Sequence, residues 1–416
     1  MAIRKRQNSD RCEGFARPEY DQGDAADTAK RTALGRLIAR LLHGGEQAPR
    51  LRTARPVVET LEPRLLLSTA PLPQPTFSAT LAYTAPTTAP LTATLELIDT
   101  GGANLTLELV ASGGTVLGSQ LLDENVRVAF TGSGMGDSLT LNLNYTPTGS
   151  TVFAPHAIGV TFNGNGNPNS AASEGQFTIN PSGSKAYDPA GLFVSSSGAA
   201  TVEGSLSLSG DMQIEAQGQI NLDAGASITT PDDIRLASDN SATPTELGAQ
   251  VPGNLTPNLL IQANVTTGVD LLGATLSGRN IGIESEADVT LDNPTVQSLF
   301  GGQVKLGALD ANATSLVSLT GANVINATGY LDIEGGANVN TTLSATPDST
   351  SNNANLDATV AVTDDQSSAN VTIGGSSSLT AGGDLAIDSS NTVTTTTTAN
   401  GSAGTSAGTA VGAALA

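Results

Sequence analysis

The chain has 416 residues, a formal net charge of −21, 3% aromatic residues and no tryptophan. An acidic excess of this size repels nucleic acid and anionic lipid headgroups, so both are excluded as partners of the main body. The scarcity of aromatic rings argues against a conventional globular core, and the 46 glycines favour a body of thin β layers. The only cysteine is Cys12, so the body has no disulfide and no thiolate metal site.

Residues 1–60 form a basic leader. Residues 1–64 hold 13 of the 18 Lys and Arg but only 9 of the 39 Asp and Glu. The sequence predicts disorder over 1–30, followed by one amphipathic helix at about 28–43 that Asp27 or Thr28 caps. The apolar face of this helix consists of Leu34, Leu37, Ile38, Leu41 and Leu42.

Neither a membrane span nor a standard secretory signal is predicted. No run reaches the roughly 18 apolar residues that a transmembrane helix needs. The leader also lacks a continuous apolar region of about 7–15 residues before a small-residue cleavage site. The closest candidate, Leu34 to Leu42, is interrupted by Arg36 and Arg40.

Residues 61–68 read Leu-Glu-Pro-Arg-Leu-Leu-Leu-Ser, where the charge of the chain changes from basic to acidic. This stretch resembles the LEPR-XLL motif of very large bacterial secreted or surface proteins, which are often adhesin-like. The resemblance implies a secreted or cell-surface location and a sorting or processing role, in contact with the export machinery. It carries no catalytic residue. The matching residues are Leu61, Glu62, Pro63, Arg64, Leu66 and Leu67.

Two segments lie between the motif and the repetitive body. Prolines predict an extended linker over 69–93. Residues 94–195 then alternate leucine or valine with polar residues between glycine clusters, which predicts short antiparallel strands in a small β domain or cap.

A short unit recurs from residue 196 onward, with two aliphatic residues flanking one variable residue. The two aliphatic side chains of each unit point to the same side of a strand, so stacked units form a continuous apolar column. The fold class that we predict is all-β, a right-handed parallel β-helix or solenoid, similar to filamentous-haemagglutinin-type solenoids. A Greek-key sandwich is the alternative. The units begin at Leu206, Met212, Ile220, Ile234, Ile281, Val289, Val304, Leu331, Val371 and Leu385.

We assign 196–340 to this solenoid and 341–416 to its continuation, where aliphatic residues give way to Thr, Ser, Ala and Asn. No polar capping element follows, so we expect the chain to be the N-terminal part of a longer protein.

We expect the protein to have no cofactor, and calcium is the only one that the sequence suggests. Residues 132–140 and 164–169 resemble the calcium-binding nonapeptide of RTX modules. The match is incomplete, because Asp137 lies one place early and the second stretch has no aspartate. We interpret both as glycine turns.

An enzyme is the main alternative function. The two histidines, His43 and His156, are far apart, and no nucleophile motif is visible. A hydrolase needs paired carboxylates, and the candidates Asp232-Asp233 and Asp364-Asp365 are sequence neighbours that would point to opposite faces of a strand. A groove lined by several carboxylates on one face of the stack would favour an enzyme, whereas a uniform Thr/Asn/Ser exterior would favour a stalk.

The sequence therefore predicts a non-enzymatic structural or adhesive component of a large secreted or cell-surface protein. Its surface ligand would be a carbohydrate or a protein. A carbohydrate-active β-helix enzyme and a calcium-binding RTX-like module remain the alternatives.

Overall fold

The structure is a computed structural model that describes residues 71–416 except 87–88, 165–174, 182, 242–244, 248–259, 293–296, 300–303, 346–355 and 402–410. The chain divides into two compact units, Met1–Arg64 and Leu65–Ala416, and all described residues belong to the second. The predicted helix at 28–43 and the motif at 61–68 therefore lie outside the described residues.

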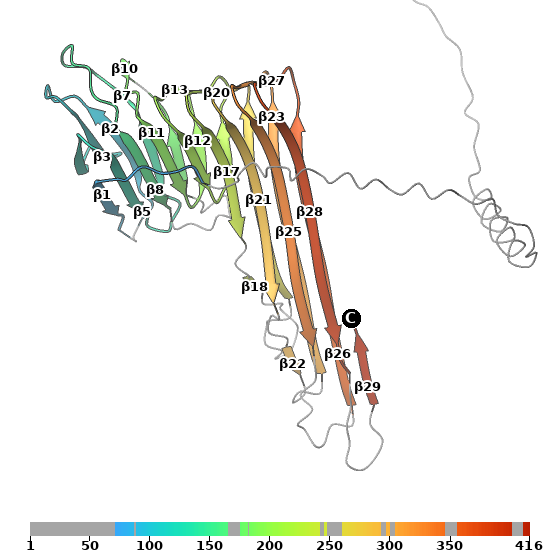
Figure 1. Cartoon of the computed structure of the whole chain (residues 1–416). Coiled ribbons are helices and arrows are strands. Elements are labelled where there is room, and N and C mark those ends of the chain that lie inside the picture. Colours follow the sequence, from blue (N-terminus) through green and yellow to red (C-terminus); the bar gives the residue numbers. More distant parts are fainter. Residues whose placement is uncertain are drawn as a thin grey trace, which may run out of the picture. The chain divides into compact units, whose positions relative to one another are not determined.

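The described residues form strands and no helix (Figure 1). Sheet I contains nine strands, all paired in parallel. In spatial order they are β1 (Ala79–Thr84), β5 (Val126–Thr131), β8 (Ala157–Asn163), β11 (Gly191–Ser196), β14 (Met212–Ala216), β17 (Ile234–Ser241), β21 (Ile281–Asp292), β25 (Leu331–Ala345) and β28 (Leu385–Ala399).

Sheet II has at least one strand between every two consecutive strands of sheet I along the chain. Its spatial order is β29 (Val411–Leu415), β26 (Leu356–Ile373), β23 (Val304–Thr320), β19 (Leu260–Leu272), β15 (Ile220–Leu222), β12 (Ala199–Val202), β9 (Gln176–Ile179), β6 (Ser138–Asn142), β2 (Thr92–Ile98), β3 (Leu105–Ala111) and β4 (Val116–Leu122). Two short strands, β18 (Thr245–Leu247) and β22 (Gln297–Leu299), pair at its margin.

Sheet III is shorter and also parallel. It contains β13 (Ser205–Ser207), β16 (Ser227–Thr229), β20 (Thr275–Gly278), β24 (Val324–Ala327) and β27 (Ser378–Ala381). The separate pair β7 (Asn144–Tyr145) and β10 (Lys185–Ala186) is antiparallel. From β11 onward each rung, meaning one full turn of the chain, adds one strand to sheet I, then to sheet II, and for most rungs to sheet III.

The aliphatic units predicted from the sequence stack in register on one another. Five of them lie side by side in sheet I and form one continuous column, with backbone spacing of roughly 4.8 Å between strands. The first residues of these five units are Met212, Ile234, Ile281, Leu331 and Leu385. Parallel stacking of this kind confirms the all-β, solenoid-like prediction and is not the pairing of a Greek-key sandwich.

The antiparallel prediction for 94–195 is correct for only part of that segment. Strands β2, β3 and β4 pair antiparallel, but β5, β6, β8 and β9 join the parallel sheets. Alternating leucines cannot distinguish the two patterns, because both bury every second side chain. Strand β1 lies within the segment that we predicted to be a linker, and β11 crosses residue 195.

Rung length changes sharply after β17. Leu192 pairs with Met212 on the next rung, whereas Leu331 pairs with Leu385, so the stretch of chain that makes one rung more than doubles. The added residues lengthen the strands of sheets I and II into a two-layered blade (Figure 1). The blade has a hydrophobic core of its own, separate from the main column, and small aliphatic residues such as Ala263, Ala287 and Ala313 dominate it.

A belt of buried hydroxyl groups separates the two cores. The Thr267 and Ser285 hydroxyl oxygens lie 2.9 Å apart, and the Ser315 hydroxyl donates to the Ser285 carbonyl oxygen at 2.7 Å. The Ser238 hydroxyl donates to the Gly218 carbonyl oxygen at 2.8 Å and accepts from the Gly268 amide at 3.0 Å. All of these bonds except the one to Gly218, which lies in the bend before β15, cross between sheets I and II and hold the sheets together where the blade begins.

Column packing gives a stability prediction with an internal control. Ile283 and Ile387 occupy the same column position on different rungs, but Ile283 is 0% exposed and Ile387 is 43% exposed. We expect Ile283→Ala to lower the free energy of unfolding by about 2–5 kcal/mol, since it leaves a cavity. Ile387→Ala should cost about 1 kcal/mol or less. Equal losses of unfolding free energy in the two variants, measured by chemical denaturation, would contradict the packing of this column.

Candidate functional site

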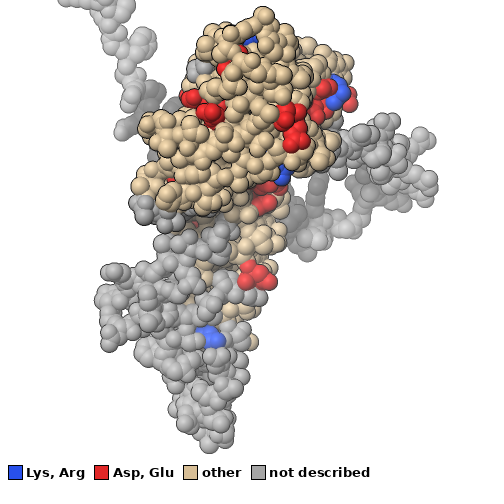
Figure 2. Space-filling model, turned by 90° about the vertical axis from the view of Figure 1, so that its left-hand side faces the viewer, with Lys and Arg blue, Asp and Glu red and all other residues tan. Residues whose placement is uncertain are grey.

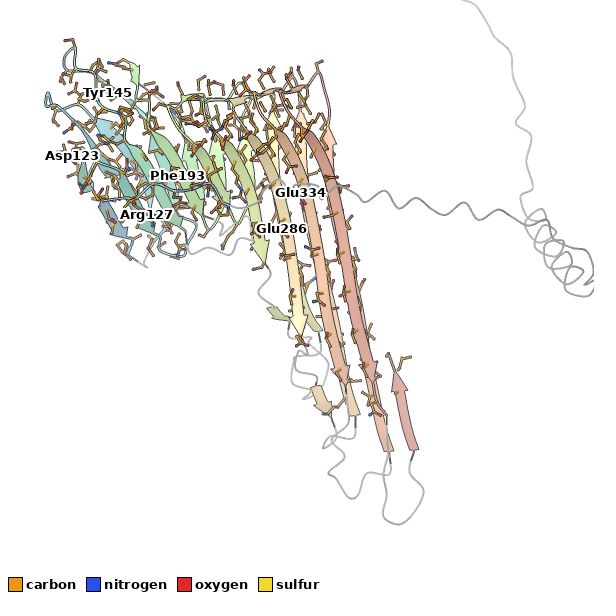
Figure 3. All side chains as sticks on the ribbon, in the orientation of Figure 1. Asp123, Arg127, Tyr145, Phe193, Glu286 and Glu334 are labelled. Atoms are coloured by element: carbon orange, nitrogen blue, oxygen red, sulfur yellow. The ribbon has the colours of Figure 1, made fainter. Side chains whose placement is uncertain are left out.

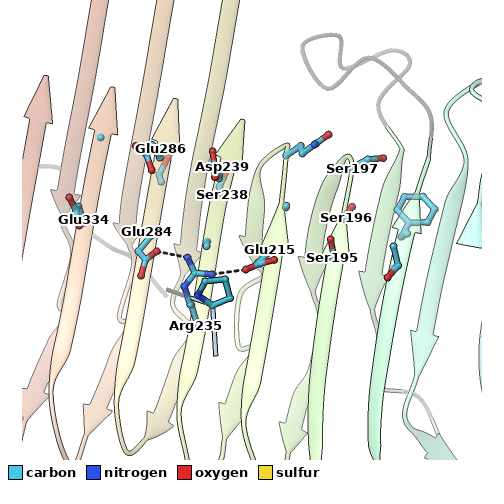
Figure 4. A pocket seen from close by; sticks show the side chains of 18 of the residues that line it. Ser195, Ser196, Ser197, Glu215, Arg235, Ser238, Asp239, Glu284, Glu286 and Glu334 are labelled. Carbon is cyan, nitrogen blue, oxygen red and sulfur yellow. Dashed lines mark hydrogen bonds and ion pairs between the residues drawn. The ribbon is translucent and has the colours of Figure 1, made fainter. Parts of the chain in front are cut away.

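A groove of about 740 Å³ lies on the outer face of sheet I, where the blade begins (Figure 4). It runs across the strands from β8 to β28 rather than along them. Its lining is polar, with serines at one end and charged groups at the centre. The charged residues that line it are Glu215, Arg235, Asp239, Glu284, Glu286 and Glu334.

Strand register brings these side chains together from distant parts of the sequence. Glu215, Ala237, Glu284 and Glu334 are consecutive register partners on β14, β17, β21 and β25. Asp239 and Glu286 are partners on the next outward row. Outward positions alternate along a strand, so both rows lie on the outer face of sheet I. Glu284 and Glu334 are one strand spacing of roughly 4.8 Å apart, and Glu215 is two spacings from Glu284.

Arg235 lies between two of the carboxylates. Its guanidinium is 2.8 Å from a Glu215 carboxylate oxygen and 2.8 Å from a Glu284 carboxylate oxygen (Figure 4). The side chains of Arg235 and Glu284 are only 12% and 14% exposed. Charge-assisted bonds of this kind tie three strands of sheet I together and fix the positions of both glutamates.

Burial changes the protonation of the groove. It raises the pKa of Glu284 to about 7, against the lowering effect of the Arg235 charge and hydrogen bond. The pKa values of Asp239 and Glu286 are also raised, by burial and by repulsion from Asp288. The Glu284 carboxyl is therefore partly protonated near neutral pH.

A strap formed by residues 71–78 lies across the outer face of sheet I. Pro71 lines the groove, and the Leu72 amide donates to the Gln213 side chain at 2.7 Å. Further along, the Phe77 ring lies under the Arg127 guanidinium at 4.7 Å and meets the Phe193 ring at 6.2 Å. Figure 3 labels Arg127 and Phe193, together with Glu286 and Glu334 at the start of the blade.

The carboxylate pairs considered from the sequence do not form a site. Asp232 and Asp233 lie in the loop before β17, where both contact Arg279 at 3.5 Å and 2.8 Å. Asp364 is exposed on β26, whereas Asp365 is half-buried and accepts from the hydroxyls of Thr341 and Thr395. The prediction that neighbouring carboxylates point to opposite faces is correct for the second pair.

The predicted glycine turn at 132–137 is organised by Asp137. This aspartate is 0% exposed, and its carboxylate accepts from the amides of Leu91 and Ser133 at 2.7 Å each. A Cβ at Gly132 would come within 2.3 Å of that carboxylate, so the turn requires glycine there. Residues 165–169 of the second candidate loop lie outside the described residues.

The groove residues themselves were missed by the sequence prediction, although a signal was present. In four of the five stacked units of sheet I, an acidic residue directly follows the second aliphatic residue. These acidic residues are Glu215, Glu284, Glu334 and Asp388. The repetition predicts a row of carboxylates on the outer face once the units are known to stack in register.

Comparisons with known proteins identify no relative. No family model, no curated protein and no solved structure matches the chain. In the part of the chain that the structure describes, no helix is long and apolar enough to cross a membrane. The same residues contain no group of three or more His, Cys, Asp or Glu arranged to hold a metal ion.

The raised pKa of Glu284 makes stability depend on pH. The Glu284 carboxyl holds its proton more tightly in the folded state than in the unfolded state. Its contribution to the free energy of unfolding is therefore complete below pH 4.5 and is lost as the pH rises through about 7. The difference corresponds to about 3 kcal/mol. We expect Glu284→Gln to flatten the fall in stability over this range, as measured by denaturation at several pH values.

The matched control is Asp223→Asn, which removes a carboxylate from an exposed turn. It should leave the pH dependence unchanged. If the two variants gave the same slope as the unmodified protein, Glu284 would not be the titrating group.

Proposed function

We propose that the chain is a non-enzymatic structural and adhesive surface protein, in which the solenoid is the scaffold and the groove is the contact surface. The observation that supports this most is the groove itself, which crosses seven strands of a continuous parallel sheet. A long, open, polar depression on a rigid sheet suits an extended ligand better than a compact one.

The charge of the groove favours one class of ligand. Five carboxylates surround one arginine, so polyanions such as acidic polysaccharides would be repelled. Hydroxyl and amide groups from Ser195, Ser197, Gln217 and Asn338 supply donors and acceptors beside the charged residues. A neutral polysaccharide, or one that carries amino sugars, matches this lining.

Two of the carboxylates are held in a manner that suits binding more than catalysis. Glu215 and Glu284 both form ion pairs with Arg235, which fixes their orientation. A general acid must bring its proton to the leaving group, whereas both of these side chains are engaged with the Arg235 guanidinium. Binding without turnover is therefore the function that we propose first.

A glycoside hydrolase is the second candidate, and a specific observation favours it. The groove is lined by several carboxylates on one face of the stack, which is the feature that we expected of an enzyme rather than of a uniform stalk. Asp239 and Glu286 are register partners, with backbones roughly 4.8 Å apart. Retaining glycosidases hold two carboxyl groups about 5 Å apart, a separation that side chains on adjacent strands can reach.

The same proposal includes the handedness of the solenoid, the capping role of its antiparallel strands and the location of the protein. Right-handed winding is supported by the strong preference of parallel crossover connections for that hand. The antiparallel strands β3 and β4 support a capping role at their end of the stack. The LEPR-XLL-like motif at 61–68 supports export to the cell surface or beyond through an export component, within a longer adhesin-like protein.

Polysaccharide binding gives a direct test of the groove. We expect the full chain to bind a soluble neutral glucan or a chitosan oligosaccharide in isothermal titration, and to ignore polygalacturonate. The double variant Asp239→Asn/Glu286→Gln should weaken the binding at least about tenfold, since it removes two charged acceptors from the groove.

The control variant is Asp310→Asn/Asp364→Asn. These two aspartates are also register partners on adjacent strands, but they lie in sheet II, away from the groove. It should bind as the unmodified protein does. Equal loss in both variants, or no binding to any of the sugars, would contradict the proposal, and release of new reducing ends would replace it with the hydrolase.

A further inference from the structure

The groove on the outer face of sheet I has two unlike halves. One outward row of side chains runs along it, with one member at or directly after each of five consecutive strands. In order these residues are Asn163, Ser197, Gln217, Asp239 and Glu286. The first three side chains are amides and a hydroxyl, whereas the last two are carboxylates. This row therefore changes from uncharged to acidic between β14 and β17.

The uncharged half presents donors and acceptors in fixed positions. The Ser197 hydroxyl accepts from the Gly164 amide at 3.0 Å and donates to the Asn163 side-chain oxygen at 3.3 Å. Ser195 and Gln217 are exposed in the same half. None of the described residues of β8 and β11 that line the groove is charged. Hydroxyl and amide groups of this kind pair with the hydroxyl and acetamido groups of neutral sugars.

The acidic half carries more negative charge than its lining compensates. Arg235 is the only Lys or Arg among the described residues of the lining, and it is engaged by the two glutamates described above. Burial raises the pKa of Glu286, and repulsion from three neighbouring carboxylates adds to this effect. These neighbours are Asp288, Asp239 and Glu334. An ammonium group placed among these carboxylates would relieve the repulsion.

The rest of the body has the same sign of charge. Residues 65–416 contain 30 Asp and Glu but only 5 Lys and Arg. Figure 2 shows the face at the β1 end of the stack, where carboxylates are scattered and basic groups are few. A field of this sign attracts cationic ligands and repels polyanions as they approach.

The groove is long and narrow. It crosses seven strands, so six strand spacings of roughly 4.8 Å give it a length of about 29 Å. Its volume of about 740 Å³ over that length corresponds to a mean cross-section of about 25 Å². One unbranched chain fits such a channel, whereas a branched or compact ligand does not. In an extended β-1,4-linked chain each sugar advances by close to one strand spacing, so successive sugars meet equivalent positions of successive rungs.

We propose, building on the binding function proposed above, that the ligand is a linear β-1,4-linked amino-sugar polymer that is only partly N-acetylated. Its acetylated sugars lie over β8, β11 and β14, and its ammonium groups lie over β17, β21 and β25. The polymer runs along the solenoid axis, because the two halves of the groove follow one another in that direction. A stretch of acetylated units next to a stretch of free amines therefore matches the lining better than either uniform polymer.

Isothermal titration of the full chain with hexasaccharides of glucosamine tests this assignment. The probes are the fully acetylated oligomer, the fully deacetylated oligomer and block oligomers that are acetylated in one half only. Both block orders are titrated, because the reducing end can face either way along the groove. We expect one block order to bind at least about tenfold more tightly than either uniform oligomer.

Variants of the two halves give matched controls for each other. Asp239→Asn/Glu286→Gln should remove the advantage of the block oligomer over the fully acetylated one. Ser195→Ala/Gln217→Ala should remove its advantage over the fully deacetylated one. All four side chains are exposed, so both variants should stay folded. Equal weakening of every oligomer by both variants would contradict the division of the groove into two halves.

The outcomes separate this inference from the function on which it rests. If the uniform oligomers bound as tightly as both block oligomers, the inferred acetylation pattern would be wrong, but the groove would still bind polysaccharide. If no oligosaccharide bound, including the neutral glucan, both proposals would fall. Equal binding of a lysine hexapeptide would show that the groove recognises charge alone, and it would overturn the assignment to an amino sugar.

Discussion

In-register stacking of very short strands is the constraint on which the rest of this structure depends. Strand β15 is only Ile220–Leu222, and it directs two side chains, Ile220 and Leu222, into the core. Alone it would bury almost nothing, but between β12 and β19 both side chains become at most 1% exposed. The fold therefore gains stability by adding rungs.

The groove and the blade both follow from this constraint. Parallel register repeats each outward position on every rung, so an acidic residue that follows an aliphatic unit becomes a row of carboxylates. Sheet spacing is set by the inward residues. Serine and threonine at the belt, and Gly335 opposite Ser315 and Val371, let sheets I and II approach closely where the blade begins. Beyond the belt, alanine and valine fill a thin second core.

Toward β28 the inner positions of the blade become polar, and hydrogen bonds between the sheets replace apolar contact. Asp365 accepts from Thr341 and Thr395, and the Thr363 and Thr397 hydroxyls lie 2.6 Å apart. This explains why the aliphatic pattern fades after residue 341 without loss of strand structure. The periodicity of two persists, but threonine and serine occupy both faces, so hydropathy alone does not reveal the buried one.

Periodicity in the sequence was enough to predict the class of fold and the stacked units of sheet I. Two aliphatic residues that flank one variable residue place both side chains on the same face of a strand. It could not predict rung length, since the same short aliphatic units begin both the short rungs before β17 and the long rungs after it. The groove was not predicted, because Glu215 and Glu284 are distant in the sequence and come together only through the register of β14, β17 and β21.

The distance between spin labels at Thr201 and Thr372 tests the stacking most directly. These outward residues are far apart in the chain, yet they belong to one register row in sheet II, through Asn221, Asp270 and Ser318. Four strand steps predict a narrow distribution centred at roughly 19 Å between the labelled backbones. A broad distribution, or a distance longer than this by several strand spacings, would contradict a continuous stack of rungs.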